Sequence, residues 1–335
     1  MYLKDTYIFG IETSCYETSA SIVKNGYEEI ATVIYSQIDI HKKFGGVVPE
    51  IASRNHTECI TIVFEECLEK ANMKASDIDA IAVTYGPGLN GALLIGIEAA
   101  KALSLALNKP LIKVNHIKGH IYANKFVGTF KFPLMALVVS GGHTEIVYME
   151  DEYSFKKIGS TVDDSIGEAY DKVARVMDIP YPGGPLIDKM ANNGKHTYNL
   201  PVPKDDDTYD FSYSGLKSAV INLVHNEKQR NKEIDKNNLA CSFQEVAVGI
   251  VVKKVMRAVK EYNVKQLLIA GGVSANSYLR KHLKEECDKV NVEILMPPIK
   301  YCTDNAAMIA SAGFYAYKKG NKADYSLSPE PGLDL

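Results

Sequence analysis

With 335 residues, the chain is longer than a single hydrophobic core usually supports, so we expect about two domains. Apolar residues make up 46% of the chain and charged residues 24%, which is the profile of a soluble globular protein. The N-terminal MYLKDTYIFG lacks the apolar stretch of a signal peptide, and no apolar run approaches the roughly 20 residues of a membrane span. The six cysteines include no C-x-x-C pair, which excludes a thiolate zinc site and a disulfide framework. We therefore expect a cytoplasmic protein with reduced thiols and no membrane contact.

The first third of the chain predicts strands that alternate with helices. A polar turn at 14–17 separates the first two strands, and Pro110 ends the second helix. Apolar residues recur at helical spacing along the first long helix. The predicted elements are strands at 7–13, 18–24 and 30–35, a helix at 48–72, a strand at 81–84, a helix at 91–108 and a strand at 111–114.

The rest of the chain begins with the same pattern, an apolar strand, a polar turn and a return strand. The predicted elements are strands at 134–139 and 143–149, helices at 167–177, 214–226 and 237–262, a strand at 266–270, and helices at 275–289 and 304–319. This repetition predicts an α/β protein built from two similar halves that face a central cleft, although chance hairpins would give a similar pattern. We expect the N-terminal half at 1–112 and a second half at 113–305 that carries most of the metal and nucleotide site. The helix near 306–325 is expected to pack back on the first half.

Three turns with paired glycines are interpreted as following apolar strands, at 140–143, 182–185 and 271–274, and the last of them also leads into a helix. Paired glycines leave backbone N–H groups free to face an anion, and the N-terminus of a following helix adds positive charge. The turns therefore favour a phosphate or nucleotide site, with tight structural turns as the alternative. None of them matches the P-loop motif or G-x-G-x-x-G, so neither a P-loop protein nor an NAD-binding domain is favoured.

His116 and His120 stand four residues apart where a helix is expected to begin, so both rings project from one face. This is the spacing of metal ligands, although a coincidental surface pair has the same spacing. A zinc protease would need Glu directly after the first histidine, and Ile117 stands there. Two histidines leave a metal site incomplete, and Asp304 is one of many candidates for the third ligand.

Nine segments of the chain together resemble the TsaD family, also called Gcp or YgjD. One departure is Tyr16, where family members usually have Asp. The segments are GIETSCYETSASIV at 10–23, HKKFGGVVPEIASRNH at 41–56, YGPGLNGALLIGIEAAKAL at 85–103, NHIKGH at 115–120, LVVSGGHTEIV at 137–147, DDSIGEAYDKVAR at 163–175, YPGGPLID at 181–188, GGVSAN at 271–276 and TDNAAMIA at 303–310.

The resemblance implies an actin/Hsp70/sugar-kinase (ASKHA) fold and a transferase. Threonylcarbamoyl-AMP would give its threonylcarbamoyl group to the exocyclic amine of adenosine 37 in tRNAs that read ANN codons, and AMP would leave. One divalent metal, Fe²⁺ in preference to Zn²⁺, would bind His116, His120 and Asp304. The residues implied to bind the adenylate are Val138, Val139, Ser140, Gly141, Gly142, Asp171, Gly184, Asp188 and Asn276.

The proton acceptor and the partners are further hypotheses. Glu12 is a speculative base because the first turn should face the cleft, and an ion-paired carboxylate is the alternative. A net charge of −3 argues against a broad RNA-binding surface, so partner proteins are expected, and the resemblance implies TsaB and TsaE. TsaB pairing could use the apolar helix face near 51–63, unless that face is buried. Phosphate contacts could come from Lys42, Lys43 and Arg54, or from Lys113, Lys118 and Lys125.

Two other functions stay open on the sequence alone. A small-molecule kinase of the same superfamily would transfer a phosphoryl group without tRNA, but it has no role for the histidine pair. A scaffold that binds nucleotide without catalysis would be favoured by the loss of a metal ligand, and none is lost.

Overall fold

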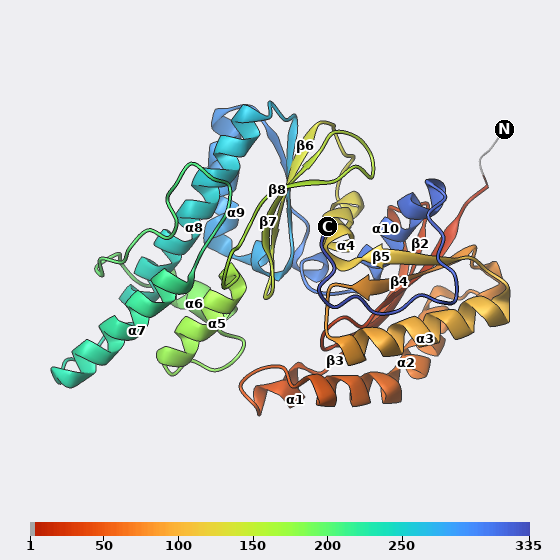
Figure 1. Cartoon of the computed structure of the whole chain (residues 1–335), viewed down its shortest axis with the longest axis horizontal. Coiled ribbons are helices and arrows are strands. Elements are labelled where there is room, and N and C mark those ends of the chain that lie inside the picture. Colours follow the sequence, from red (N-terminus) through yellow and green to blue (C-terminus); the bar gives the residue numbers. More distant parts are fainter. Residues whose placement is uncertain (1–3) are drawn as a thin grey trace. The chain divides into compact units, whose positions relative to one another are not determined.

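The computed structural model describes residues 4–335 and divides the chain into two compact units (Figure 1). The first unit contains the chain up to Thr129 together with Pro297–Leu335, and the second is Phe130–Met296. These limits differ from the expected halves at 1–112 and 113–305. The segment that carries both histidines belongs to the first unit because its strand pairs there, and Asp304 belongs to the first unit as well.

The first unit is built on a five-stranded mixed sheet in the order β3-β2-β1-β4-β5. Its strands are β1 (Tyr7–Glu12), β2 (Glu17–Lys24), β3 (Glu28–Ser36), β4 (Ala80–Gly86) and β5 (Leu111–Asn115). The first three form antiparallel pairs, and β4 and β5 join in parallel. Nearly every residue of β1, β2 and β4 is buried, as expected for strands that are covered on both faces.

Helices pack against this sheet, and Figure 1 shows α2 and α3 running side by side. The helices of the first unit are α1 (Ile38–Lys42), α2 (Pro49–Ala71), α3 (Asn90–Leu107), α4 (His116–Tyr122) and α10 (Ala306–Lys318), with the 3₁₀ turns η1 (Ala75–Asp77), η2 (Ala123–Phe126) and η4 (Ile299–Tyr301). The apolar face of α2, including Ile60, Val63 and Cys67, lies in the core. Burial within the fold therefore accounts for that face.

Helix α3 is long and apolar enough, by length and composition, to cross a membrane. A helix from the core of a soluble protein passes the same test. Because α3 packs against α2 and β4, its composition is weak evidence for a membrane protein.

Helix α10 approaches the sheet closely at Gly10, in the middle of β1. A Cβ atom at this position would lie 2.8 Å from the Cβ atom of Ala310 and would clash with the Ala306 carbonyl oxygen. The glycine therefore allows α10, which follows the second unit in the sequence, to pack directly on β1.

The second unit repeats the strand arrangement of the first, in the order β10-β9-β6-β7-β8. Its strands are β6 (Leu134–Val139), β7 (Thr144–Met149), β8 (Lys156–Ser160), β9 (Gln266–Ala270) and β10 (Glu293–Leu295). In both units a three-stranded antiparallel meander is followed by two parallel strands on the other side of the first strand. The expected pair of similar α/β halves is confirmed.

The helices of the second unit pack around its apolar core. They are α5 (Ile166–Val176), α6 (Gly183–Ala191), α7 (Ser214–Gln229), α8 (Lys236–Glu261), η3 (Gly272–Ala275) and α9 (Ser277–Lys289). Helix α6 begins where the sequence predicts only a turn. Gly183, Gly184 and Pro185 fit its first turn because the N–H groups there have no partner within the helix.

The close approach at Gly10 gives a stability prediction. We expect Gly10→Ala to destabilise the first unit by about 1–3 kcal/mol because the added methyl group must push α10 off the sheet. Urea unfolding followed by circular dichroism, with hydrogen exchange of β1 and α10 peptides, measures the effect. Gly332→Ala is the matched control, since its Cβ would meet no described atom within 4 Å, and it should stay within about 0.5 kcal/mol of the parent. Equal effects of the two changes would contradict the argument.

Candidate functional site

The histidine pair lies on α4, a short helix whose start is fixed by a side-chain cap. Asn115 ends β5, and its side-chain oxygen accepts hydrogen bonds from the backbone N–H groups of Ile117 at 2.8 Å and Lys118 at 3.2 Å, which caps the helix. Its amide group donates to the backbone carbonyl of Asp334 at 3.2 Å. The C-terminal tail thus contacts the residue that starts the helix.

Helices α4 and α10 pack closely at Gly119. A Cβ atom at this position would lie 2.6 Å from Cδ1, the end of the Ile309 side chain, so a larger residue would require that side chain to move. Asp304 lies just before α10, whose N-cap Asn305 accepts a hydrogen bond from the N–H of Met308 at 3.0 Å. The close packing therefore brings the two histidines to the start of α10.

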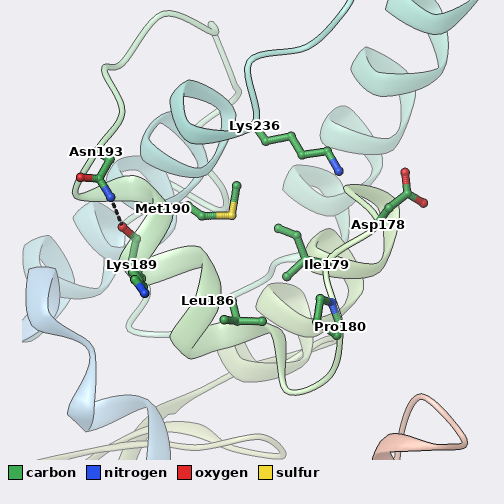
Figure 2. A pocket seen from close by; sticks show the side chains of 8 residues that line it. All are labelled: Asp178, Ile179, Pro180, Leu186, Lys189, Met190, Asn193 and Lys236. Carbon is green, nitrogen blue, oxygen red and sulfur yellow. Dashed lines mark hydrogen bonds between the residues drawn. The ribbon is translucent and has the colours of Figure 1, made fainter.

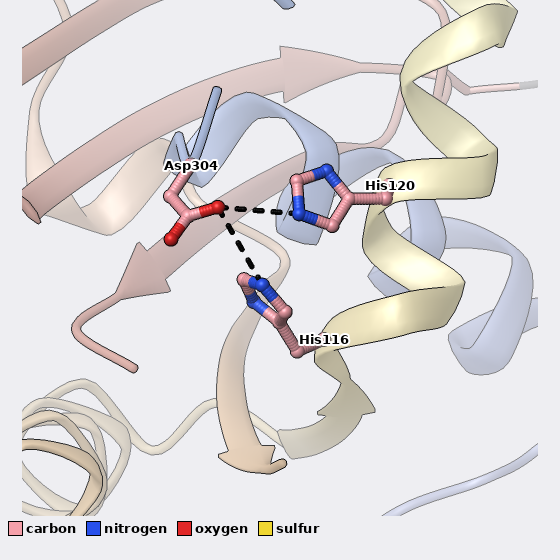
Figure 3. A group of neighbouring side chains, drawn as sticks. All are labelled: His116, His120 and Asp304. Carbon is pink, nitrogen blue, oxygen red and sulfur yellow. Dashed lines mark ion pairs between the residues drawn. The ribbon is translucent and has the colours of Figure 1, made fainter. Parts of the chain in front are cut away.

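His116, His120 and Asp304 converge, as Figure 3 shows. One Asp304 oxygen lies 3.5 Å from His116 Nε2 and 3.2 Å from His120 Nε2. The three ligand atoms lie within 4.8 Å of one another. Both histidines are buried, while the Asp304 side chain keeps 23% of its surface exposed, which leaves the group open on one side.

The inner side of this group is closed by Glu12, which is fully buried. Its carboxylate accepts hydrogen bonds from the Ser14 N–H at 2.5 Å and the Thr84 hydroxyl at 2.6 Å, and lies 3.1 Å from His116 Nδ1. The Ser14 hydroxyl lies 3.2 Å from the same nitrogen. These contacts orient the His116 ring so that its Nε2 points toward Asp304.

The charges of the group are interdependent. Burial alone would raise the pKa of Glu12, but the nearby His116 holds the pKa of that carboxyl below its ordinary value. Burial likewise opposes protonation of His116, yet Glu12 and Asp304 raise its pKa to about 9. His120 differs because burial dominates and lowers its pKa. Without a metal, these shifts favour a positively charged His116, with a proton on each ring nitrogen, paired with the negatively charged Glu12.

The donor set fits a divalent metal. The Nε2 atoms of both buried histidines face the same Asp304 oxygen, His120 at 3.2 Å and His116 at 3.5 Å. A metal ion bound by these atoms would displace the proton from His116. Two imidazoles and one carboxylate with an open side form the ligand set of catalytic metal sites.

Glu17 is a half-buried residue near this group that the sequence analysis did not single out. One oxygen accepts a hydrogen bond from the Ser36 hydroxyl at 3.0 Å, while the other is buried and has no hydrogen-bond partner in the described chain. Burial, with a smaller effect of the Asp304 and Glu12 charges, raises the pKa of Glu17 to about 7 against the lowering effect of the Ser36 hydrogen bond. The sequence offered one signal for Glu17. Side chains alternate between the two faces of a strand, so Glu17 lies on the same face of β2 as Ser19. The Ser19 hydroxyl oxygen accepts a hydrogen bond from the Ala306 N–H, which places this face toward the start of α10.

In the second unit, the turn after β6 has an open surface. A Cβ atom at Gly141 or Gly142 would meet no described atom within 4 Å. The Ser140 hydroxyl oxygen accepts hydrogen bonds from the N–H groups of Gly142 at 3.3 Å and His143 at 3.1 Å, and Ser165 donates to the Gly141 carbonyl at 2.6 Å. The turn is thus rigid and exposed, and two of its N–H groups already have a weak partner.

Asp171 and Gly184 lie where α5 meets α6. The Asp171 carboxylate accepts a hydrogen bond from the Gly183 N–H at 2.8 Å, and burial raises the pKa of this carboxyl against that hydrogen bond. A Cβ atom at Gly184 would come no closer than 4.0 Å to its nearest neighbour, Tyr170. Asp171 therefore fixes the start of α6, and Gly184 leaves open space beside it.

Asp188 and Asn276 hold the start of α9. Asp188 accepts hydrogen bonds from the Ser277 N–H at 3.0 Å and the Ser277 hydroxyl at 2.9 Å. Asn276 caps α9 by accepting from the Leu279 N–H at 2.8 Å. All the residues expected to bind the adenylate thus lie in the second unit, and the polar ones each have a protein partner.

Most of the basic side chains considered for phosphate contacts also have protein partners. Lys42 pairs with Asp39 at 2.9 Å and Arg54 with Glu50 at 2.6 Å, and these exposed pairs contribute little stability. Lys113 lies over the ring of Tyr85, and Lys125 over the ring of Tyr315. These contacts favour no particular path for RNA.

The second unit also carries an open apolar hollow of about 490 Å³ beside α6 (Figure 2). It is lined by residues 178–180, by the exposed side of α6 and by Lys236. None of the predicted site residues lines it.

Comparison with known proteins was consistent over the whole chain. Residues 28–311 match the TsaD family, described as tRNA N6-adenosine threonylcarbamoyltransferase. A protein of that name from Bacillus cereus is 60% identical over 334 residues, covering 99% of this chain and 97% of the relative. Relatives of the same name from Bacillus subtilis and Geobacillus thermodenitrificans are 58% and 54% identical, each over 99% of this chain and over 96% and 98% of the relative.

Solved structures with low sequence identity share the fold. HypF from T. kodakarensis aligns with a TM-score of 0.64 at 12% identity, over 96% of this chain and 49% of that one. Component A of the (R)-2-hydroxyglutaryl-CoA dehydratase of Acidaminococcus fermentans aligns with a TM-score of 0.54 at 17% identity, over 94% of this chain and 98% of that one. The expected ASKHA fold is confirmed, and the chain belongs to the TsaD family of tRNA N6-adenosine threonylcarbamoyltransferases.

Proposed function

We propose that this chain transfers a threonylcarbamoyl group to the exocyclic N6 amine of an adenosine in tRNA. The observation that carries the proposal is identity of 54–60% to proteins of that name along almost the entire chain. The finer proposal is that threonylcarbamoyl-AMP is the donor and adenosine 37 of ANN-reading tRNAs the acceptor. The bond from the carbamoyl carbon to the phosphate oxygen breaks, a bond from that carbon to N6 forms, N6 loses a proton and AMP leaves.

The first unit would hold one divalent metal on His116, His120 and Asp304. Fe²⁺ is the favoured ion and Zn²⁺ the alternative, since both accept imidazole and carboxylate ligands. A metal bound there would act as a Lewis acid toward a carbonyl or carboxylate oxygen of the substrate. The approach of His116 Nε2 and His120 Nε2 to one Asp304 oxygen, at 3.5 Å and 3.2 Å, supports this assignment.

Glu12 fits an orienting role better than the role of base that the sequence suggested. Both of its oxygens accept hydrogen bonds, it is fully buried, and His116 lowers its pKa, all of which weaken it as a proton acceptor. Glu17 is better suited to that role. Its pKa is about 7, and one of its oxygens has no hydrogen-bond partner in the described chain.

The second unit would bind the adenylate. Ser140, Gly141 and Gly142 would line its phosphate side, and the fully buried Val138 and Val139 would hold this turn at the end of β6. The open space at Gly184 would admit a flat base. Asp171, Asp188 and Asn276 would shape the pocket, since each fixes the first turn of a helix whose N–H groups attract anions.

Two competing functions receive less support. A small-molecule kinase of the same fold leaves the converging His116, His120 and Asp304 without a use. A scaffold without catalysis gives no reason for the Glu17 oxygen that is buried without a hydrogen-bond partner in the described chain, since such a group costs stability and is found most often at functional sites.

The partners and the compartment belong to the same proposal. The net charge of −3 and the paired surface cations support a need for partner proteins that help to bind tRNA. We propose TsaB and TsaE for this role and the cytoplasm as the site of the reaction.

The function is tested by reconstitution with labelled threonine, bicarbonate, ATP, a threonylcarbamoyl-AMP synthase, both partners and tRNA. We expect labelled N6-threonylcarbamoyladenosine in the digested tRNA only when the chain is present. A labelled phosphoryl product that forms without tRNA would favour the kinase instead.

The metal proposal predicts about one ion per purified chain, held by His120 and Asp304. We expect His120→Ala and Asp304→Ala to lower bound metal to near zero, because two ligands do not hold an ion against dialysis. Elemental analysis and calorimetric titration of Zn²⁺ measure this without reference to activity. His196→Ala, which removes an exposed histidine paired with Glu245, is the matched control and should keep the metal. Full occupancy in both ligand variants would refute the site.

The raised pKa of Glu17 predicts how stability depends on pH in the chelator-treated chain. An unfolded Glu17 loses its proton near pH 4.5 and the folded one near pH 7, so its stabilising effect is lost as pH rises between these values. Glu17→Gln has no proton to lose, so we expect it to match the parent at pH 5 and to be more stable by about 1–3 kcal/mol at pH 8. Urea unfolding at both pH values, with the exposed Glu65→Gln as control, provides the measurement.

The same variant tests Glu17 as the base. We expect Glu17→Gln to slow single-turnover transfer by about 10²–10⁴-fold, because the amide cannot accept the amine proton. Unchanged transfer would leave the pH effect standing and remove the catalytic role.

The open turn at Gly142 predicts a change in binding without a change in stability. We expect Gly142→Val to weaken AMP binding about tenfold or more, because its side chain would occupy the phosphate position. The melting temperature should hold, since a Cβ there meets no described atom within 4 Å. Gly215→Val, at another open glycine of the second unit, is the control and should bind AMP normally. Equal AMP affinity in both variants would exclude the turn from the pocket.

A further inference from the structure

Gln244 lies on α8 in the core of the second unit and is only 1% exposed. Its neighbours on the helix, Phe243, Ala247 and Val248, are apolar and fully buried. Burying an amide among apolar side chains is unfavourable unless every polar atom finds a partner. The geometry of its partners therefore decides what this residue does.

Both ends of the Gln244 amide are engaged. Its oxygen accepts hydrogen bonds from Asn276 Nδ2 at 2.8 Å and from the Tyr170 hydroxyl at 3.0 Å. Its nitrogen donates to Asp188 Oδ1 at 3.0 Å. The opposite orientation would place the NH₂ group against two donors and the oxygen against a carboxylate, so the amide has one compatible orientation.

These three partners come from three different helices. Tyr170 lies on α5, Asp188 on α6, and Asn276 is the N-cap of α9. Asp188 and Asn276 in turn accept the N–H groups of Ser277 and Leu279 in the first turn of α9. One buried amide thus connects α5, α6 and the start of α9 to α8.

We propose that Gln244 is a positioning residue for the nucleotide pocket, which it serves by fixing Asp188 and Asn276 at the start of α9. This inference rests on the proposed function, because those two residues are the ones assigned to the adenylate pocket. Gln244 is too deeply buried to touch a ligand, so it acts through its two partners. An amide is required at this position because it donates to a carboxylate and accepts from two donors at once.

A merely structural role would lower stability and leave nucleotide affinity intact. Gln266 offers a matched control, because it is a fully buried amide of the same unit that accepts the Lys131 N–H at 3.0 Å. Gln266 lies on β9 and joins the start of that strand to the segment before β6. Methionine has nearly the shape of glutamine without its hydrogen bonds, so Gln244→Met and Gln266→Met remove equivalent groups.

The first experiment measures the Kd of AMP by calorimetry and the melting temperature of the whole chain. We expect both methionine variants to melt earlier, but only Gln244→Met to bind AMP about tenfold more weakly. AMP affinity within twofold of the parent in Gln244→Met would overturn the inference. Failure of the parent chain itself to bind AMP would instead overturn the proposed nucleotide site, and this inference with it.

A change of charge gives a second test. Gln244→Glu places a carboxylate against Asp188 Oδ1, which the amide nitrogen now contacts at 3.0 Å, and should weaken AMP binding at least tenfold. AMP affinity within twofold of the parent in Gln244→Glu would likewise overturn the inference.

Discussion

The packing of α4 against α10 at Gly119 is the constraint on which the metal group depends. His116 and His120 flank Gly119 on α4, and Asp304 lies just before α10. A Cβ at Gly119 would lie 2.6 Å from the end of the Ile309 side chain, so the helices are closely packed where the three side chains meet. Gly10 is more restrictive on the sheet side of α10, because a Cβ there would meet the backbone of that helix. Close packing thus fixes α10 on the sheet, and Asp304 lies just before this helix.

The second unit uses polar side chains to fix the starts of helices. Asp171 holds the first turn of α6, and Asp188 and Asn276 hold that of α9. The N–H groups at a helix start have no partner within the helix, so a carboxylate or amide there stabilises both the turn and its direction. Asp171, Asp188 and Asn276, which were expected to contact the ligand, therefore also hold the helix starts beside the proposed pocket in place. Gln244 links two of them from behind.

Local pattern predicted the buried strands well and the site only in part. The predicted strands at 134–139 and 266–270 match β6 and β9, because a short unbroken apolar run between two turns is typical of a buried strand. Helix α6 was missed because Pro182–Pro185 has the composition of a turn. The i, i+4 spacing identified His116 and His120, but Asp304 came only from family resemblance, since no local rule links positions so distant. Glu17 was missed because its burial depends on the strands and loops that surround it.

The first unit is discontinuous in the sequence, and this affects how the chain can fold during synthesis. Both histidines leave the ribosome long before Asp304 and α10, with the whole second unit between them. Domains tend to fold as units as they emerge, so the second unit can complete its core while the first still lacks a central helix. Asn115, which caps α4, can donate its hydrogen bond to the Asp334 carbonyl only after the C-terminal tail has been made. The proposed metal group can therefore form only after α10 has been made, and a truncated product lacking α10 would expose the β1 surface that this helix covers.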